Sequence, residues 1–268
     1  MSRPSRYIDR ERYYTELAQT SEAFILPYVE RFHKLSCKDT VLEIGCGEGG
    51  LLYPFATRNC QITGVDISKG KIENAISFFK KRQLQGRFFV NNILDDNTDI
   101  AGKAFDIIIA HDIIEHIEPE SKRRFMDMID RYTTQDGIVY IGFPAWQMPF
   151  GGHQQTCSKT ISSKTPFTHL LSLKTYQAFL RKCGENEVKI AELTSIYRSR
   201  MTIEKFESLC SDTGFEILDR TLWLINPHYK AKFNLVPLKL PFFISAIPHV
   251  RNLFSTSCFY ILKRKSNA

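Results

Sequence analysis

A turn rich in glycine, residues 45–49 (GCGEG), follows directly after the short apolar run at 41–44 (VLEI). Glycine reaches backbone angles that other residues avoid, and it lets the main chain approach a ligand that a Cβ atom would block. Asp66 stands 19 residues after Gly47, at the end of the next apolar run, 61–65. A carboxylate there can accept hydrogen bonds from both hydroxyls of a ribose. A tight strand-to-helix connection would explain the turn alone, but the turn and Asp66 together predict a site for a nucleotide-like ligand.

The rest of the chain alternates short apolar runs with apolar stripes of helical spacing. Seven runs are predicted as strands: 41–44, 61–65, 87–90, 105–110, 137–141, 215–224 and 258–262. The unbroken apolar run at 105–110 suits a strand that is covered on both faces. Because right-handed crossovers lay each intervening helix across the sheet, the alternation predicts an α/β fold with a mostly parallel seven-stranded sheet and helices on both faces. The last two strands are expected to pair antiparallel.

The domain organisation is predicted to be a single domain over residues 1–268, opened by a helical segment at 1–36. Two stretches interrupt the regular alternation, at 150–200 and at 226–254. The first begins with glycines in a polar run, and both follow late strands. We therefore expect these insertions to be lids or acceptor-binding segments.

Composition indicates a soluble globular chain, with 43% hydrophobic and 24% charged residues. The seven cysteines are scattered and form no Cys-x-x-Cys pair, and the N-terminus lacks the apolar core of a signal peptide, so we expect reduced thiols and a cytoplasmic location. Prolines and charges break the apolar stretch 233–254, which excludes a membrane-spanning helix and leaves peripheral membrane contact open. The net charge of +7 gives no specific support for nucleic acid, because the basic clusters at 80–82 and 263–265 fall at a helix end and at the chain terminus.

Four segments carry a family resemblance: 41–49 (VLEIGCGEG), 64–68 (GVDIS), 105–109 (FDIII) and 114–117 (IEHI). Together they resemble the class I S-adenosylmethionine-dependent methyltransferases over Thr40 to about Pro144, with a weaker tail over 200–216. The resemblance implies a Rossmann-like sheet, S-adenosylmethionine as cofactor, and methyl transfer as the activity.

Individual cofactor contacts follow from the resemblance by position. Glu43 would lie near the methionine portion, since Leu42 and Ile44 already account for the buried positions and a surface role for Glu43 is less favoured. The backbone of the glycine turn would pass beneath the cofactor, Asp66 would hold the ribose, and Ile67 would flank the adenine. Asn92 stands where the family often has an aspartate, and its side-chain oxygen can also accept from the adenine amino group. The implied cofactor-binding residues are Glu43, Gly45, Cys46, Gly47, Gly49, Asp66, Ile67, Asn92, Ile93 and His111.

Four polar residues follow the fourth predicted strand, where parallel sheets deliver side chains to a ligand: His111, Asp112, Glu115 and His116. If a helical turn follows the strand, the last three share one face. His153 in the 150–200 insertion is expected to join them. We assign Glu115, His116 and His153 as the catalytic residues, acting as a general-base cluster or as ligands of a divalent ion. A capped helix start with surface histidines is favoured over the metal, so no residue is assigned as a metal ligand.

The acceptor is predicted from a local resemblance. Residues 112–116 (DIIEH) are similar to a segment of quinone-precursor O-methyltransferases, which implies a hydroxyl of a small molecule. Small-RNA 2′-O-methyltransferases carry a similar segment and a later histidine that together hold a divalent ion, so RNA 2′-O-methylation is the alternative. An NAD-dependent oxidoreductase shares the glycine pattern, although no Tyr-x-x-x-Lys pair occurs. A cofactor-binding protein without catalysis also stays open, because such motifs establish binding better than turnover.

Overall fold

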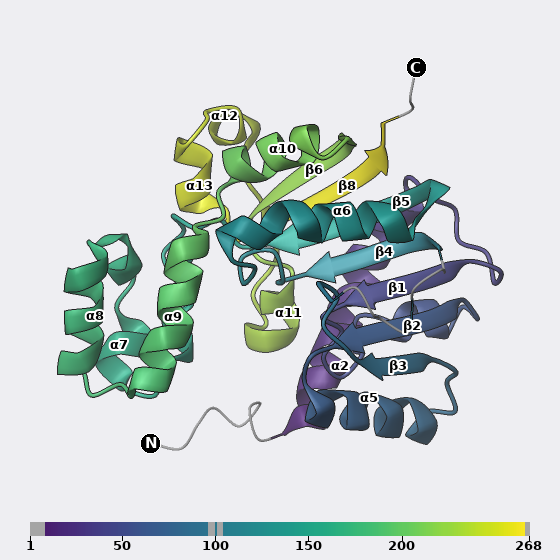
Figure 1. Cartoon of the computed structure of the whole chain (residues 1–268), viewed down its shortest axis with the longest axis horizontal. Helices are drawn as coiled ribbons and strands as arrows, with labels where there is room; N and C mark the ends of the chain where they lie inside the picture. The colour runs from purple at the N-terminus through teal and green to yellow at the C-terminus, as the bar shows by residue number, and fades with distance from the viewer. Residues whose placement is uncertain (1–8, 96–99, 101–103, 266–268) are drawn as a thin grey trace.

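The fold is built on one sheet, seen in a computed structural model that describes residues 9–95, 100 and 104–265. Its strands are β1 (Thr40–Ile44), β2 (Gln61–Asp66), β3 (Arg87–Val90), β4 (Phe105–His111), β5 (Thr133–Phe143), β6 (Phe215–Ile225), β7 (Leu238–Lys239) and β8 (Ser257–Arg264). They lie in the order β3-β2-β1-β4-β5-β8-β6-β7 (Figure 1). Strands β1 to β5 pair in parallel, whereas β8, β6 and β7 pair antiparallel.

The predicted α/β fold with a mostly parallel, Rossmann-like sheet is confirmed, as is the antiparallel pairing of β6 with β8. The predicted number of seven strands is wrong, since the sheet has eight. The additional strand, β7, is two residues long and stands between Pro237 and Pro241 in the 226–254 segment. Two residues are too few to show a strand's period of two, so no sequence pattern marks β7.

The helices cover both faces of the sheet. Their bounds are α2 (Arg10–Thr20), the π-helical turn η1 (Ser21–Ile25), α3 (Leu26–Glu30), α4 (Tyr53–Ala56), α5 (Lys69–Lys81), η2 (Pro119–Ser121), α6 (Lys122–Tyr132), η3 (Gln154–Thr156), α7 (Thr160–Lys164), η4 (Thr168–Leu170), α8 (Leu173–Lys182), α9 (Glu187–Ser199), α10 (Ile203–Asp212), α11 (His228–Phe233), α12 (Phe242–Ser245) and α13 (Val250–Phe254). The helical segment predicted at 1–36 contains α2, η1 and α3 in succession. Residues 1–8 of the predicted 1–36 segment lie outside the described residues.

Alternate side chains of β4 enter two separate cores. Ile108 and Ala110 pack on the face covered by α6 and α10, whereas Ile107 and Ile109 pack on the face covered by α2, α3, α4 and α5. Figure 1 shows α6 lying across the sheet in front of β4 and β5. A central parallel strand buried on both faces explains the unbroken apolar run of β4.

The two insertions differ in how they pack. In the 150–200 insertion, α7, α8 and α9 lie on the side toward which the β4 arrow points (Figure 1). Helices α8 and α9 share a core that includes Tyr176, Leu193 and Tyr197. In the 226–254 segment, α11 packs on α2, and the chain then continues through β7, α12 and α13. The lid role of both insertions stays a prediction.

The described part of the chain bears on two further expectations, the absence of a membrane-spanning helix and reduced cysteines. No helix there is both long enough and apolar enough to cross a bilayer. All seven cysteines lie in it, and all are free thiols.

A carboxylate on α10 anchors the end of the 226–254 segment. Glu204 accepts hydrogen bonds from the His249 N–H (3.0 Å), Asn252 Nδ2 (2.6 Å) and Arg251 Nε (3.0 Å). Burial by itself would raise the pKa of Glu204, but these hydrogen bonds outweigh it and bring the pKa to about 2. The carboxylate form is therefore the one that the fold stabilises.

Glu204→Gln is expected to lower the free energy of unfolding by about 1–3 kcal/mol at pH 7, because charge-assisted hydrogen bonds are lost. Since the folded pKa lies below the ordinary 4.5, this contribution is complete above about pH 4.5 and is lost as the pH falls toward 2. Denaturant unfolding at pH 7 and pH 3 measures it. A difference between wild type and variant that is equally large at both pH values would contradict the assignment.

Candidate functional site

The carboxyl ends of three neighbouring strands form the candidate site. Strand β1 lies between β2 and β4 and is parallel to both. The residues that follow these strands therefore meet at one edge of the sheet. The glycine turn follows β1, Asp66 ends β2, and the segment 112–117, which carries Glu115 and His116, follows β4.

The glycine turn needs its glycines for two different reasons. Gly45, Gly47 and Gly49 have φ values of 71°, 52° and 80°, in the left-handed region that favours glycine. A Cβ atom on Gly45 would collide with the Ile113 side chain, so packing alone excludes one there. A Cβ on Gly47 would meet only Lys71 Cδ, at 4.0 Å. The main chain at Gly47 is thus open to a ligand.

Asp66 lies beside this open stretch of backbone. Its Oδ2 accepts from the Gly47 N–H (2.9 Å) and its Oδ1 from the Ser68 N–H (2.8 Å). Each carboxylate oxygen keeps acceptor capacity for a further donor. The next residue, Ile67, is 76% exposed, although it is large and apolar. Asp66 and Ile67 therefore offer a charged acceptor next to an apolar surface.

Glu43 is buried at the same edge. It is 3% exposed, and its Oε2 has no hydrogen-bond partner. Burial, together with the charge of Asp66, raises the pKa of Glu43 well above its ordinary value. The structure excludes the surface role for Glu43. A buried acceptor without a partner costs free energy, which a ligand that donates a hydrogen bond would recover.

Three predicted cofactor residues have side chains engaged elsewhere. The Cys46 side chain packs against Gly64: a Cβ atom placed on Gly64 would lie only 2.8 Å from Cys46 Sγ. Ile93 is 6% exposed and belongs to the core under α6. The His111 ring stacks on Tyr140 with centroids 5.8 Å apart, so it lies over β5 and away from the glycine turn. Only the main chain of Cys46 borders the open stretch at Gly47.

Asn92 follows β3 as predicted, but its side chain is occupied by a local turn. Its Oδ1 accepts from the Leu94 N–H (3.1 Å), and its Nδ2 donates to Asp95 (3.3 Å). One acceptor position remains on Oδ1. Its contact with an adenine amino group stays a prediction.

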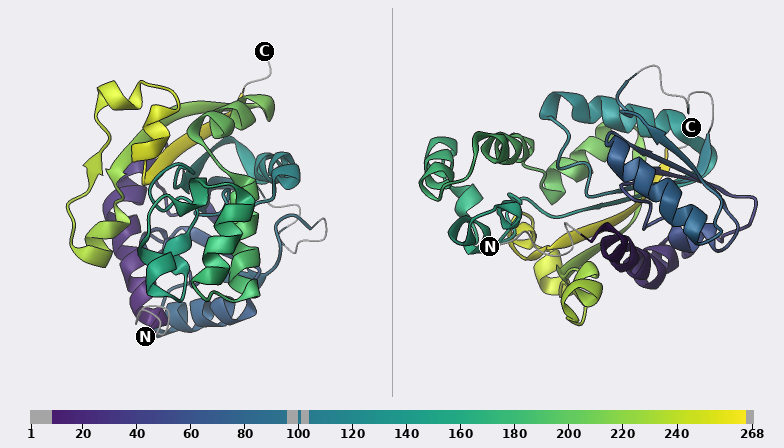
Figure 2. Two further views of the ribbon diagram at one scale, coloured as in Figure 1. Left: turned by 90° about the vertical axis from the view of Figure 1, so that its left-hand side faces the viewer. Right: turned by 90° about the horizontal axis from the view of Figure 1, so that it is seen from below.

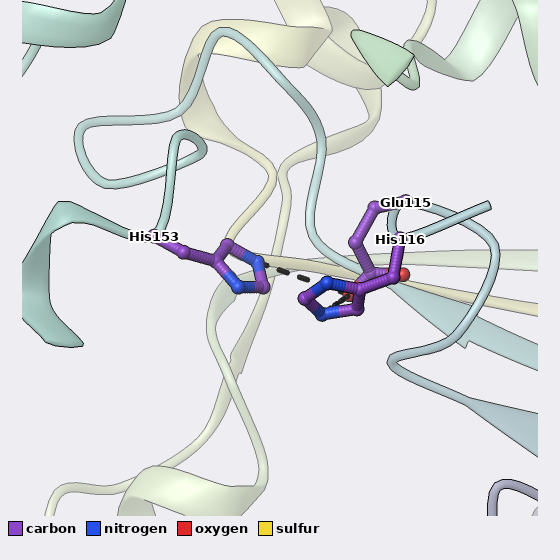
Figure 3. A group of neighbouring side chains, drawn as sticks. All are labelled: Glu115, His116 and His153. Atoms are coloured by element: carbon purple, nitrogen blue, oxygen red, sulfur yellow. Dashed lines mark ion pairs between the residues drawn. The ribbon is translucent and has the colours of Figure 1, made fainter. Parts of the chain in front are cut away.

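Glu115, His116 and His153 lie together, as Figure 3 shows. Glu115 Oε1 is 3.9 Å from His116 Nε2 and 3.8 Å from His153 Nε2. One possible ligand atom from each residue lies within 4.8 Å of the others. His153 comes from the 150–200 insertion, so the cluster joins that insertion to the loop after β4.

Asp112 lies outside this cluster. Its φ of 55° is left-handed, so no helical turn begins at Asp112, and the predicted shared face with Glu115 and His116 is wrong. Its side chain is 53% exposed, with Oδ1 3.8 Å from His111 Nε2. Asp112 still acts through its charge, which contributes to the raised pKa of Glu115.

Desolvation by surrounding protein atoms suppresses charge on the three clustered residues. Glu115 is 3% exposed, and neither carboxylate oxygen has a hydrogen-bond partner. Burial, with the charge of Asp112, raises the pKa of Glu115 well above its ordinary value. The His116 side chain is 42% exposed, yet desolvation by the protein atoms around its ring lowers its pKa; the same effect, with the nearby His116, lowers the pKa of His153 to about 4. Both imidazoles are therefore neutral near pH 7 and can accept a proton.

Lys122 holds the loop that carries Glu115 and His116, although Lys122 was not among the predicted site residues. Its Nζ donates to the carbonyl oxygens of Ile114 and Ile117 and to Ser199 Oγ, each at 2.7 Å. Burial lowers the pKa of Lys122 to about 8, which leaves it protonated at neutral pH. A signal was present: Lys122 is the first member of the stripe Lys122, Phe125, Met126 and Ile129 on the buried face of α6.

His169 holds the loop that carries His153. It is fully buried, its Nε2 donates to the Trp146 carbonyl oxygen (2.8 Å), and its Nδ1 accepts from Gln154 Nε2 (3.2 Å). Burial lowers the pKa of His169 to about 4, which favours the neutral ring with one donor and one acceptor nitrogen. A Cβ atom on Gly152 would collide with His169. No sequence pattern marks this pairing, because its partners come from irregular loops.

Comparison with known proteins gives a family match for part of the chain. Residues 41–137 match the family model described as "Methyltransferase domain". The ubiquinone biosynthesis O-methyltransferase of Rickettsia conorii is 29% identical over 119 residues, which cover 43% of this chain and 39% of that protein. The (S)-tetrahydroprotoberberine N-methyltransferase of Eschscholzia californica is 30% identical over 122 residues, which cover 42% of this chain and 33% of that protein. The chain thus spans less than half the length of these relatives.

Solved structures extend the likeness of the fold to most of the chain. The magnesium protoporphyrin IX methyltransferase of Synechocystis, solved with bound SAH, matches with a TM-score of 0.54 and 14% identity, covering 93% of this chain and 84% of that one. At that identity the match shows the fold. The chain therefore has the Rossmann-like fold of this methyltransferase, and its residues 41–137 match the methyltransferase-domain family model.

Proposed function

We propose that this protein transfers a methyl group from S-adenosylmethionine to a hydroxyl of a small molecule. The observation that carries the proposal is the place of the Glu115, His116 and His153 cluster. The Ile113 side chain, two residues before Glu115, packs against Gly45 of the glycine turn. The cluster thus adjoins the turn on which the cofactor would lie.

The residues at the edge of β1 and β2 fit S-adenosylmethionine. Glu43 Oε2 would accept from the amino group of its methionine portion, and its burial leaves it with no other partner. Asp66 would accept from the ribose hydroxyls, and the exposed Ile67 would pack on the adenine. The bound cofactor supplies a methyl group on a positively charged sulfur. The SAH bound to the Synechocystis methyltransferase supports this cofactor.

The cluster favours a hydroxyl acceptor over an amine. A hydroxyl is a poor nucleophile and must lose its proton during transfer, whereas a neutral amine attacks without a base. The neutral imidazoles of His116 and His153 are able to take that proton. Holding the acceptor oxygen in line with the methyl group would supply most of the remaining acceleration. The two curated relatives, one an O- and one an N-methyltransferase, are compatible with either acceptor.

One observation favours the alternative function, RNA 2′-O-methylation assisted by a divalent ion. Both oxygens of the buried Glu115 lack partners, and the two imidazoles stand close enough to share one ion with it. A carboxylate with two imidazoles suits Mn, Fe or Zn. Turnover that survives excess chelator would exclude this version, and a screen of metabolites beside short RNAs for a mass gain of one methylene identifies the acceptor.

Asp66→Ala is expected to weaken S-adenosylmethionine binding by about 1–3 kcal/mol, roughly 5- to 150-fold, because a charged acceptor is lost. Titration calorimetry measures it. Asp136→Ala is the matched control, since that carboxylate is 96% exposed at the far end of β5. An unchanged affinity in Asp66→Ala removes Asp66 from the site, and binding of NAD without binding of S-adenosylmethionine overturns the proposed cofactor.

A further inference from the structure

The stretch from Phe233 to Phe254 exposes an unusual amount of apolar surface. Of the 18 large hydrophobic side chains that are exposed among the described residues, 10 lie in this stretch. Phe242 is 86% exposed, Val236 74% and Phe243 70%. Exposed apolar area concentrated in one segment marks an interaction surface. We call this stretch the 233–254 surface.

The 233–254 surface occupies one border of the molecule. Strand β7 is the outermost strand of the sheet, and it pairs only through β6. Figure 2 (left) shows the segment running along one edge, from α11 past β7 to α12. Phe242 and Phe243 begin α12 directly after Pro241, so two adjacent aromatic rings project from a short rigid turn. The surface is therefore accessible along its length.

The exposed charged side chains in or beside this surface are lysines. No aspartate or glutamate occurs after Asp219, whereas Lys230 and Lys239 are exposed in or beside the surface. Lys230 Nζ contacts Asn234 Oδ1 (2.9 Å), and Lys239 Nζ lies 5.9 Å from the Trp223 ring centroid. Arg251 contributes nothing to this charge, because Glu204 and Glu207 pair with it. The surface thus combines exposed aromatic rings with lysines.

We propose that the 233–254 surface binds the interface of a bilayer that contains anionic phospholipids, with Phe242 and Phe243 inserted among the acyl chains and the lysines on the headgroup phosphates. Aromatic rings beside cations are the composition that lies in such an interface. Helices α11, α12 and α13 have six, four and five residues, so the segment would lie on the bilayer and not span it. A second copy of the chain is a poorer occupant, because it would bring lysines against lysines with no acid in either segment to pair them. This proposal does not depend on the methyl-transfer reaction.

Flotation of the full chain with vesicles tests the proposal. Binding to phosphatidylcholine vesicles that contain phosphatidylglycerol is expected, with weaker binding to phosphatidylcholine alone. Phe242→Ser/Phe243→Ser should lower the partition coefficient roughly tenfold for each ring removed. Lys230→Gln/Lys239→Gln should lower it about fivefold for each lysine, on the anionic vesicles only.

Ile161→Ser/Val188→Ser is the matched control, since these apolar side chains are 66% and 80% exposed in the 150–200 insertion. It should bind vesicles as the wild type does. All variants are compared at equal melting temperature, which is expected because the altered side chains are exposed. No binding to anionic vesicles, or full binding by the phenylalanine variant, overturns the proposal. A wild-type dimer in light scattering that the phenylalanine variant converts to a monomer also overturns it, in favour of a second copy as the occupant.

Discussion

His116→Ala/His153→Ala is expected to lower turnover by about 10²- to 10⁴-fold, which is the usual contribution of a positioned proton acceptor. Affinity for S-adenosylmethionine should stay within about twofold, because neither imidazole belongs to the Glu43, Gly47 and Asp66 group. The two rings lie 4.9 Å apart beside one carboxyl group, so one can replace the other in part, and the double variant is the decisive one. Methyl transfer to the identified acceptor, together with calorimetry of the cofactor, separates these two effects.

The control for the histidine pair is His33→Ala. His33 pairs with Asp39 just before β1, at the opposite end of that strand from the glycine turn, and its loss should leave turnover unchanged. Full turnover in the double histidine variant would refute both the base and the metal versions of the site. If the variant is inactive, Glu115→Gln and chelation distinguish them: a metal site should lose activity in both experiments, whereas a base site should tolerate chelation.

The sequence predicted the sheet well because burial dictates its strands. Strand β4 packs into both cores and therefore had to be apolar throughout, and the glycines at 45 and 49 are imposed by left-handed backbone angles. Those constraints act locally, so a single sequence displays them. Strand β7 escaped prediction because its place depends on pairing with β6 and not on its own pattern.

The site was only partly predictable, because part of its arrangement depends on contacts between distant segments and not on local sequence patterns. Glu115, His116 and His153 were correctly expected to meet, but Asp112 was wrongly included, because its left-handed backbone turns the chain before any helix begins. In sequence His111 was as good a candidate for the site as its neighbours, yet its side chain contacts Tyr140 on the adjacent strand β5. Which way a side chain points at a strand end depends on the partner strand, and one sequence does not display that.

The roles of Lys122 and His169 depend on tertiary contacts that bring distant loops together. Both residues satisfy main-chain carbonyl groups of loops that carry the clustered side chains. Buried carbonyl groups need donors, but the sequence does not say which donor reaches them. In each case the burial of a polar residue among apolar ones is the physical sign of such a contact.

Lys122→Met is expected to lower the free energy of unfolding by about 2–4 kcal/mol. Methionine fills much of the same volume, but it leaves the carbonyl groups of Ile114 and Ile117 and the hydroxyl of Ser199 without their donor. Each buried acceptor left unsatisfied costs about 1–3 kcal/mol, and partial entry of water reduces the sum. Ser199→Ala removes one acceptor and keeps the donor, so its cost should be the smaller of the two.

Lys122→Met should lower activity as well as stability. Lys122 joins the loop of Glu115 and His116 to α9. Helix α9 belongs to the 150–200 insertion, which also carries His153. At a temperature where Lys122→Met is still folded, turnover should fall while S-adenosylmethionine affinity changes little. Lys174→Met is the control, since Lys174 is exposed on α8 and its replacement should shift stability by no more than about 0.5 kcal/mol. Denaturant unfolding of Lys122→Met, Ser199→Ala and Lys174→Met ranks the three variants by their loss of free energy of unfolding. If Lys122→Met costs no more than Lys174→Met, the three hydrogen bonds of the buried ammonium group do not stabilise the loop, and the convergence of Glu115, His116 and His153 must have another cause.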